Sequence, residues 1–252
     1  MTVCMKTLAL SAAVSLGACT GIAQEPSHND QPRPRLAVPR WTVAAQLGAD
    51  GNDAAWQGAA VIPSLSLSPG TEGNPEPRPT QVKLMWDEQF LFVRFICIDD
   101  HLESPGSGRD DDHHRGDVVE VFIDPVGDCR QYIELQVCPE NQVLDQLFVL
   151  SAEPRFRSDL RFTSEVYPAE VWGIREWNMP GLRTQTSVRR LDDGRYEWIT
   201  DLAIPAEPLL KRLKAKRFVA GQEMRCNLLR YDWAGQLGTR GRKLISMNWS
   251  PV

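Results

Sequence analysis

The stretch TQVKLMW-DEQ-FLFVRFICI, residues 80–98, decides the fold class. Residues 80–86 alternate polar and apolar side chains, which is the pattern of a strand with one buried face. Residues 90–98 are almost continuously apolar and favour a more deeply buried strand. The turn-forming residues 87–89 stand between them, so the stretch predicts a β-hairpin.

Further strands are predicted on the C-terminal side of this hairpin. Residues 117–124 (DVVEVFID) form a third strand that ends at Pro125, because proline cannot donate to a strand ladder. Residues 131–137 (QYIELQV) form a fourth. Later segments with strand character are 142–150, 183–190, 195–203, 223–232 and 243–249. Helical signals are confined to residues 53–56 and 208–213, so we expect an all-β chain: an antiparallel β-sandwich or jelly roll with one or two short helices.

The N-terminus has the pattern of an export signal. Lys6 precedes an apolar run over residues 7–16, which is too short to span a bilayer, a task that needs ~20 apolar residues. The sequence Leu-Gly-Ala-Cys that ends at Cys19 resembles the lipobox of bacterial lipoproteins, which implies cleavage after residue 18 and lipidation of Cys19. The same resemblance implies, through Thr20 after the cysteine, sorting to the outer membrane. An ordinary secretory signal with a chance cysteine is the alternative.

The remaining chain divides into a spacer and one domain. Residues 19–40 are polar and proline-rich and predict a flexible, extended tether after the signal of residues 1–18. Residues 41–252 contain no second linker and no repeat, and about 210 residues suit one large sandwich. The net charge of −5 argues against a nucleic-acid partner, which would need clustered Lys and Arg.

The cysteines of the domain leave two possibilities open. Cys97, Cys129, Cys138 and Cys226 allow three full disulfide pairings in an exported chain, or they are buried thiols. None of them stands in a Cys-x-x-Cys pair, so a structural zinc site is not expected.

Several motifs, taken in order, resemble a known family. They are residues 47–56 (LGADGNDAAW), 82–93 (VKLMWDEQFLFV), 115–125 (RGDVVEVFIDP), 197–205 (EWITDLAIP), 225–230 (RCNLLR) and 248–251 (NWSP). Together they resemble the family 9 carbohydrate-binding modules and their DOMON-like relatives over residues 42–252. The resemblance implies a β-sandwich, sugar binding without chemistry and, in many members, structural calcium.

The resemblance also implies site residues. Well-known members hold a sugar between two tryptophans, and the position of the first is His114 here. The second tryptophan of those members lies in a segment beyond the NWSP motif, and this sequence ends at Val252. The resemblance therefore assigns neither clamp tryptophan to a residue of this sequence. Glu120 occupies the position of a family carboxylate that hydrogen-bonds sugar hydroxyls, and Glu134 stands where those members have an arginine. Arg109 and Asn227 are further candidate ligand-binding residues.

The loop of residues 101–116 (HLESPGSGRDDDHHRG) leads directly into the Glu120 strand. It could contact a sugar through His114, or bind a metal, because carboxylates suit calcium and two histidines with an aspartate suit zinc. It could also be a solvated charged loop. A calcium site is further expected around Asp99, Asp100 and Asp124, which could instead be turn residues.

Tryptophans outside the framework motifs are candidates for stacking on a sugar ring. Trp172 and Trp177, together with Trp233, lie near glycine or proline in loop-like contexts, where a ring could be exposed or could simply pack. Trp56, Trp86 and Trp198 are expected in the core.

The expected function is non-catalytic carbohydrate binding by a membrane-anchored, exported lipoprotein that supports polysaccharide capture or breakdown. A glycoside hydrolase would need two carboxyls ~5 to 9.5 Å apart, which Glu120 and Glu134 on adjacent strands could supply, but no catalytic signature accompanies them. A haem protein would need axial ligands, and no pattern supports His114 and Met247 in that role, so no haem is expected. A structural or protein-binding sandwich lipoprotein that has lost the sugar clamp is the main alternative.

Overall fold

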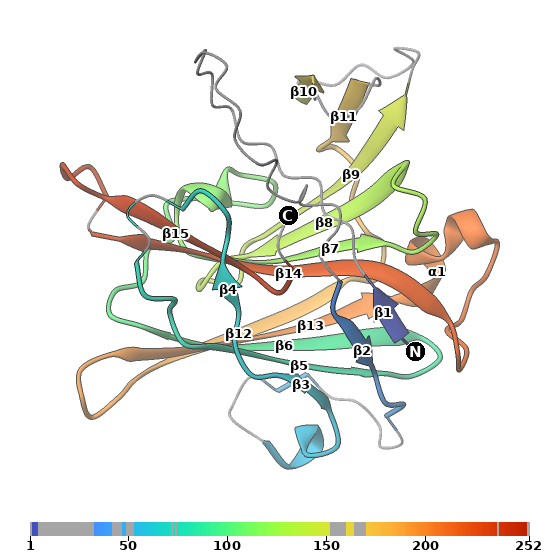
Figure 1. The fold of residues 1–252 in the computed structure, drawn as a ribbon, viewed down its shortest axis with the longest axis horizontal. Coiled ribbons are helices and arrows are strands. Elements are labelled where there is room, and N and C mark those ends of the chain that lie inside the picture. The colour runs from blue at the N-terminus through green and yellow to red at the C-terminus, as the bar shows by residue number, and fades with distance from the viewer. Residues whose placement is uncertain are drawn as a thin grey trace, which may run out of the picture.

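Two β-sheets packed face to face form the body of the protein (Figure 1). The computed structural model describes residues 2–4, 33–41, 47–48, 53–71, 73, 75–151, 160–163, 170–235 and 237–250. The ten-stranded sheet has the spatial order β10 (Leu160–Thr163), β11 (Glu170–Ile174), β9 (Val143–Ser151), β8 (Gln131–Val137), β7 (Val118–Asp124), β14 (Glu223–Ala234), β1 (Thr2–Cys4) and β2 (Arg35–Ala37). Strand β15 (Lys243–Asn248) pairs with β14, and β4 (Ser66–Leu67) pairs with β15.

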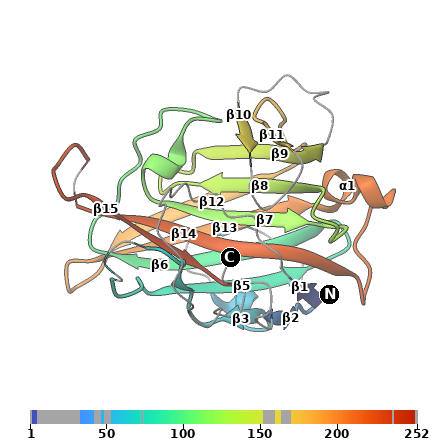
Figure 2. The ribbon, with the colours of Figure 1, turned by 45° about the horizontal axis from the view of Figure 1, so that its top comes forward.

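The five-stranded sheet lies beneath the larger one (Figure 2). Its order is β12 (Arg183–Arg190), β13 (Tyr196–Pro205), β6 (Phe90–Asp99), β5 (Thr80–Trp86) and β3 (Ala60–Ile62). The described strand pairs are antiparallel, except that β1 runs parallel to β14. Short helices are η2 (Asp53–Trp56), η3 (His113–Arg115), α1 (Ala206–Leu209) and η4 (Lys211–Leu213). The predicted all-β antiparallel sandwich is therefore confirmed.

Strand β7 shows how the alternating sequence divides the larger sheet into two faces. Val119, Val121 and Ile123 point into the core between the sheets, where each is 0% exposed. The intervening residues Glu120 and Phe122 point to the opposite face, because successive side chains of a strand alternate. The polar members of the strand are thus displayed on the side of the sheet that faces away from the sandwich core.

The predicted leader and lipidation site lie mostly outside the described residues. Of residues 1–18 the structure describes strand β1, and Cys19 is not described. The last part of the predicted tether is packed, since Val38 is 3% exposed and its carbonyl accepts a hydrogen bond from Trp86 Nε1 at 3.0 Å. Within the described ranges, no helix combines the length and the apolar character that a membrane span requires.

The four domain cysteines are free thiols in the structure. Cys97, Cys138 and Cys226 are buried, and Cys129 is partly buried in the turn after β7. Burial raises the pKa of Cys97 to about 11 and that of Cys226 to about 12, so both are protonated at neutral pH. Of the two possibilities left open by the sequence, the structure has the thiols rather than a disulfide pairing.

Candidate functional site

A row of polar side chains crosses three neighbouring strands on the face of the larger sheet that points away from the core. Glu120 lies on β7, Glu134 and Gln136 lie on β8, and Gln146 lies on β9. The register places Glu120 opposite Gln136 and Glu134 opposite Gln146. Directly opposite residues share a face, so the four side chains form one patch, which we call the outer patch. All four are at most 7% exposed.

The outer patch is rich in hydrogen-bond acceptors. Gln136 Nε2 donates to Glu134 Oε1 at 2.7 Å. Glu120 Oε2, Gln136 Oε1 and Gln146 Oε1 are buried and have no hydrogen-bond partner among the described residues. A buried acceptor without a donor costs about 1–3 kcal/mol. This concentration of unpaired oxygens calls for a partner that brings several O–H or N–H donors.

The two carboxyls of the outer patch hold protons unusually strongly. Burial raises the pKa of Glu120 well above its ordinary value, and the neighbouring Glu134 carboxylate raises it further. Burial also raises the pKa of Glu134 to about 7, although Gln136, Gln146 and Arg175 oppose the rise. Since desolvation and like charge both disfavour ionisation, the pair does not carry two full negative charges at neutral pH.

A guanidinium and an imidazole approach the outer patch from separate segments. Arg175 follows β11, and its charge lowers the pKa of both Glu134 and His114, which places it beside both. Its Nη2 donates to Asp112 Oδ1 at 2.9 Å. His114 lies in η3, which packs against β8, and burial lowers its pKa, so that its ring is neutral at neutral pH. The structure therefore places the helix of His114 against the strand of Glu134, with Arg175 near both side chains.

Aromatic rings continue the same face of the sheet. Phe122 lies opposite Glu134, and Tyr132 lies opposite Phe148. The rings of Tyr132 and Phe148 stack at a centroid distance of 4.6 Å, and Phe122 lies 5.9 Å from Tyr132. Phe122 and Tyr132 are partly exposed. They offer apolar ring surface next to the polar row, the combination that sugar rings require.

The loop that carries His114 is packed rather than freely solvated. His113 is 1% exposed, and Gly106 passes so close to it that an added Cβ would clash with the imidazole ring. Trp233 Nε1 donates to the carbonyl of His114 at 3.0 Å. Arg242 pairs with Glu103 at 2.7 Å and fastens the start of the loop. These contacts fix where η3 stands relative to the outer patch.

The other predicted ligand-binding residues lie elsewhere or have structural partners. Arg109 pairs with the buried Asp145 and with Asn178. Asn227 shares the outward face, but its Nδ2 donates to Ser250 O and its Oδ1 accepts from Ser250 N. Trp172 belongs to β11, where its register with Val149 places it on the core side, and it is 7% exposed. Trp177 lines a separate cavity beside α1.

The three aspartates predicted to bind calcium do not come together. Asp100 pairs with Arg78 at 2.6 Å, and Asp124 accepts the backbone N–H groups of the turn that follows β7. Asp99 instead lies with Asp117 and Asp232, each offering an oxygen within 4.8 Å of the others. Asp117 and Asp124 flank β7 at opposite ends, ~23 Å apart at about 3.3 Å per residue.

A guanidinium, rather than a metal ion, suits the Asp99, Asp117 and Asp232 group. Arg230 is 0% exposed, and its Nη2 lies 2.5 Å from Asp99 Oδ2 and 3.1 Å from Asp232 Oδ2. Both Asp117 oxygens accept backbone N–H groups, from Glu103 and Trp233. Calcium takes 6–8 oxygen ligands, and these carboxylates have too few uncommitted oxygens. Among the described residues no other trio of this kind forms, so His113 and His114 do not complete a zinc site.

Sequence reasoning missed Gln136 and Gln146 of the outer patch, and Arg175 beside it. Gln136 follows Glu134 by two positions and so shares its face, a signal that strand alternation supplies. Gln146 and Arg175 depend on the pairing of β8 with β9 and of β9 with β11. Register of this kind is a long-range property that the local pattern does not fix.

Comparison with known proteins agrees with the fold and the motifs. The model of the family described as "Carbohydrate family 9 binding domain-like" matches residues 48–138, so the predicted resemblance is confirmed there. A crystal structure from Bacteroides uniformis ATCC 8492, described as a candidate carbohydrate-binding protein, aligns with a TM-score of 0.57 and 13% identity. The alignment covers 85% of this chain and 88% of that one, and it shows a shared fold.

Two further solved structures are similar at lower scores. Both are a family 9 carbohydrate-binding module from Caldicellulosiruptor kristjanssonii, one in complex with glucose and one with cellotriose. Each is 15% identical with a TM-score of 0.48 and covers 84% of this chain. The alignments cover 84% and 82% of those chains. No curated protein matches the sequence.

Proposed function

We propose that this protein binds a saccharide at the outer patch and performs no chemistry on it. The observation that carries the proposal is the set of buried, unpaired oxygens of Glu120, Gln136 and Gln146. Saccharide hydroxyls are dense hydrogen-bond donors, and carboxylates and amides in a fixed array orient them. The family-model match over residues 48–138 supports carbohydrate binding independently of this geometry.

The arrangement also suits the remaining chemistry of a sugar. Phe122 and Tyr132 offer ring surface beside the polar row for a C–H-rich sugar face. Arg175 supplies guanidinium donors beside Glu134. His114 stands at the position of the missing clamp tryptophan and offers a flat, neutral ring.

The test is calorimetric titration of the purified protein with glucose, xylose, cellobiose, xylobiose and polysaccharide digests. We expect one sugar class to bind and Glu120→Ala to weaken it about 10- to 100-fold, since leaving a buried polar group without its hydrogen-bond partner costs about 1–3 kcal/mol. Glu140→Ala is the matched control, because Glu140 is exposed in the β8–β9 turn. The absence of heat from every sugar, in folded protein, would favour the alternative of a structural or protein-binding sandwich.

Whether the bound saccharide is cleaved can be measured on the same mixtures of protein and oligosaccharide. Glu120 and Glu134 are diagonal neighbours on adjacent strands, and both have raised pKa values, so a carboxyl pair exists. We propose that the pair orients hydroxyls. Chromatography of the bound oligosaccharide after long incubation is expected to recover it uncleaved, and release of shorter sugars would replace this proposal with hydrolysis.

We further propose that Cys19 carries a lipid that anchors the domain in the cell envelope, at the outer membrane, where it supports polysaccharide capture or breakdown. Expression in a bacterial host with labelled palmitate is expected to label the wild-type chain and to leave Cys19→Ser unlabelled. The Cys19→Ser chain is expected either to retain its signal peptide or to be released from the membrane. Cys4→Ser is the control and is expected to be labelled like the wild type. Equal labelling of wild type and Cys19→Ser would remove the anchor from the proposal.

A further inference from the structure

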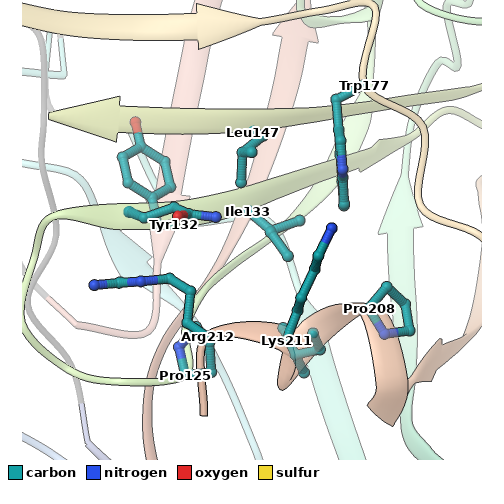
Figure 3. Close-up of a pocket in the computed structure, with 10 residues that line it drawn as sticks. Pro125, Tyr132, Ile133, Leu147, Trp177, Pro208, Lys211 and Arg212 are labelled. Carbon is teal, nitrogen blue, oxygen red and sulfur yellow. The ribbon is translucent and has the colours of Figure 1, made fainter. Parts of the chain in front are cut away.

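A cavity lies on the other side of the larger sheet from the outer patch. It occupies about 350 Å³ between the ends of β8 and β9 and the helical segment formed by α1 and η4 (Figure 3). Ile133 and Leu147 form part of its wall. Their neighbours Glu134 and Gln146 point to the opposite face, because side chains alternate along a strand. The cavity therefore lies on the other face of β8 and β9 from the outer patch, although Tyr132 of the proposed sugar site also lines it.

The wall of the cavity combines apolar side chains with the ring of Trp177, and Tyr132 also lines it. Ile133, Leu147, Pro208 and Leu209 supply aliphatic surface, and Trp177 stands along one side (Figure 3). Trp177 is only partly buried, so its ring surface is not used up by packing. The volume falls at the lower end of the roughly 300–1,000 Å³ of small-molecule sites. A single ring-shaped ligand fits these dimensions and this chemistry.

A positively charged side chain of η4 lines the cavity. Lys211 rises from η4 with its ammonium group directed toward Trp177 (Figure 3). Lys211 forms no ion pair with a described residue, whereas Arg212 is paired with Asp128 at 2.6 and 3.1 Å. Gln131 adds an amide to the rim. The cavity thus combines an apolar wall, a flat ring and one uncompensated cation.

We propose that this cavity binds a uronic acid, either free or as a residue of an acidic polysaccharide. The C–H face of the sugar ring would lie against Trp177, and its carboxylate would pair with the ammonium of Lys211. Gln131 would hydrogen-bond a hydroxyl at the rim. This site goes beyond the proposed function, since it uses none of the residues of the outer patch and selects for charge.

The proposal is tested by titrating the full chain with glucuronate and galacturonate while following the Trp177 indole N–H resonance, assigned with Trp177→Phe. Lys211→Met, which retains the aliphatic stem, is expected to weaken uronate binding about tenfold, and Lys211→Arg is expected to restore most of it. Lys214→Met is the matched control, because Lys214 is exposed nearby and does not line the cavity. Affinity should also fall with added salt, as the ammonium is exposed.

The ligand comparison separates this site from other possibilities. Glucuronamide, which is uncharged and nearly isosteric, is expected to leave the Trp177 resonance unmoved, and Glu120→Ala is expected to bind uronates like the wild type. Equal binding by Lys211→Met and wild type would overturn the proposal, as would equal shifts from glucuronamide. Binding of benzoate without binding of either uronate would overturn the saccharide assignment.

Discussion

Replacing Arg230 with methionine is expected to lower the free energy of unfolding by about 3–5 kcal/mol at pH 7.5. The guanidinium is 0% exposed and pairs with Asp99 on β6 and with Asp232 on its own strand. It also donates to Thr80 Oγ1 at 3.0 Å, so one side chain links the two sheets. Removing one partner of a buried ion pair leaves uncompensated charge, which is far costlier than losing an exposed pair.

Urea denaturation followed by tryptophan fluorescence measures the effect, with an unchanged m-value indicating that the unfolded surface is the same. Arg195→Met is the control, because Arg195 and Asp193 form an ion pair that is about half exposed on both sides. Such an exposed pair is screened by solvent and contributes little to stability. A loss for Arg230→Met no larger than for Arg195→Met would mean that the buried carboxyls are neutral and that Arg230 is dispensable.

The effect of calcium on the melting temperature gives a second test of the Arg230 ion pairs. In the wild type the guanidinium already supplies positive charge to Asp99 and Asp232, so added calcium is expected to leave the melting temperature unchanged. In Arg230→Met the carboxylates of Asp99, Asp117 and Asp232 lose that charge, and calcium is expected to recover part of the stability. A wild type that calcium stabilises as much as the variant would contradict this account.

The Arg230 cluster shows what the sequence could not supply. Arg230 and Asp99 are 131 positions apart and meet because β14 crosses over the end of β6. The predicted calcium group of Asp99, Asp100 and Asp124 assumed that strand-end aspartates of β6 and β7 converge. Strands that run in opposite directions place their C-terminal ends on opposite sides of the sandwich. Aspartates at the C-terminal ends of β6 and β7 can therefore lie far apart. Residue 117, at the other end of β7, is the one that meets Asp99.

Elements governed by local pattern were predictable. The hairpin over residues 80–98 became β5 and β6, and Pro125 ended β7, because alternation, turn residues and a missing N–H act within a few residues. The neighbouring strands of Glu120 and Glu134 followed from motif order, and the ligand-binding roles of these residues stay predictions. Trp172 was expected in a loop, but it lies in β11, a strand whose pairing with β9 gives little signal in the sequence. Arg175 reaches the outer patch through that same pairing.

Replacing Glu134 with glutamine is expected to stabilise the ligand-free protein by about 2 kcal/mol at pH 8 and hardly at all at pH 5. The pKa of Glu134 is raised to about 7 from 4.5, so the folded state binds a proton that the unfolded state releases over this range. Stability therefore falls as pH rises from about 4.5 to about 7, and the penalty is complete above that window. Glutamine removes the charge while its amide oxygen can still accept from Gln136.

The comparison must be made against the wild type at each pH, since other groups titrate in the same range. Burial lowers the pKa of His113 and His114, and their contribution to stability rises with pH below about 6.5. Asp117, whose pKa is raised to about 6 by burial, acts in the same direction as Glu134. The difference between Glu134→Gln and wild type in urea denaturation cancels these contributions. A difference that does not change between pH 5 and pH 8 would contradict the raised pKa.

Saccharide binding gives the same substitution an effect of opposite sign. Hydroxyl donors favour the ionised carboxylate, so binding releases protons and wild-type affinity should rise between pH 5 and pH 7. Glu134→Gln should bind more weakly and lose this pH dependence, although it is the more stable protein at pH 8. Calorimetry in two buffers of different ionisation enthalpy measures the proton release directly. A carboxyl with a merely structural role would change stability without changing the proton count of binding, whereas one that holds hydroxyls must change both.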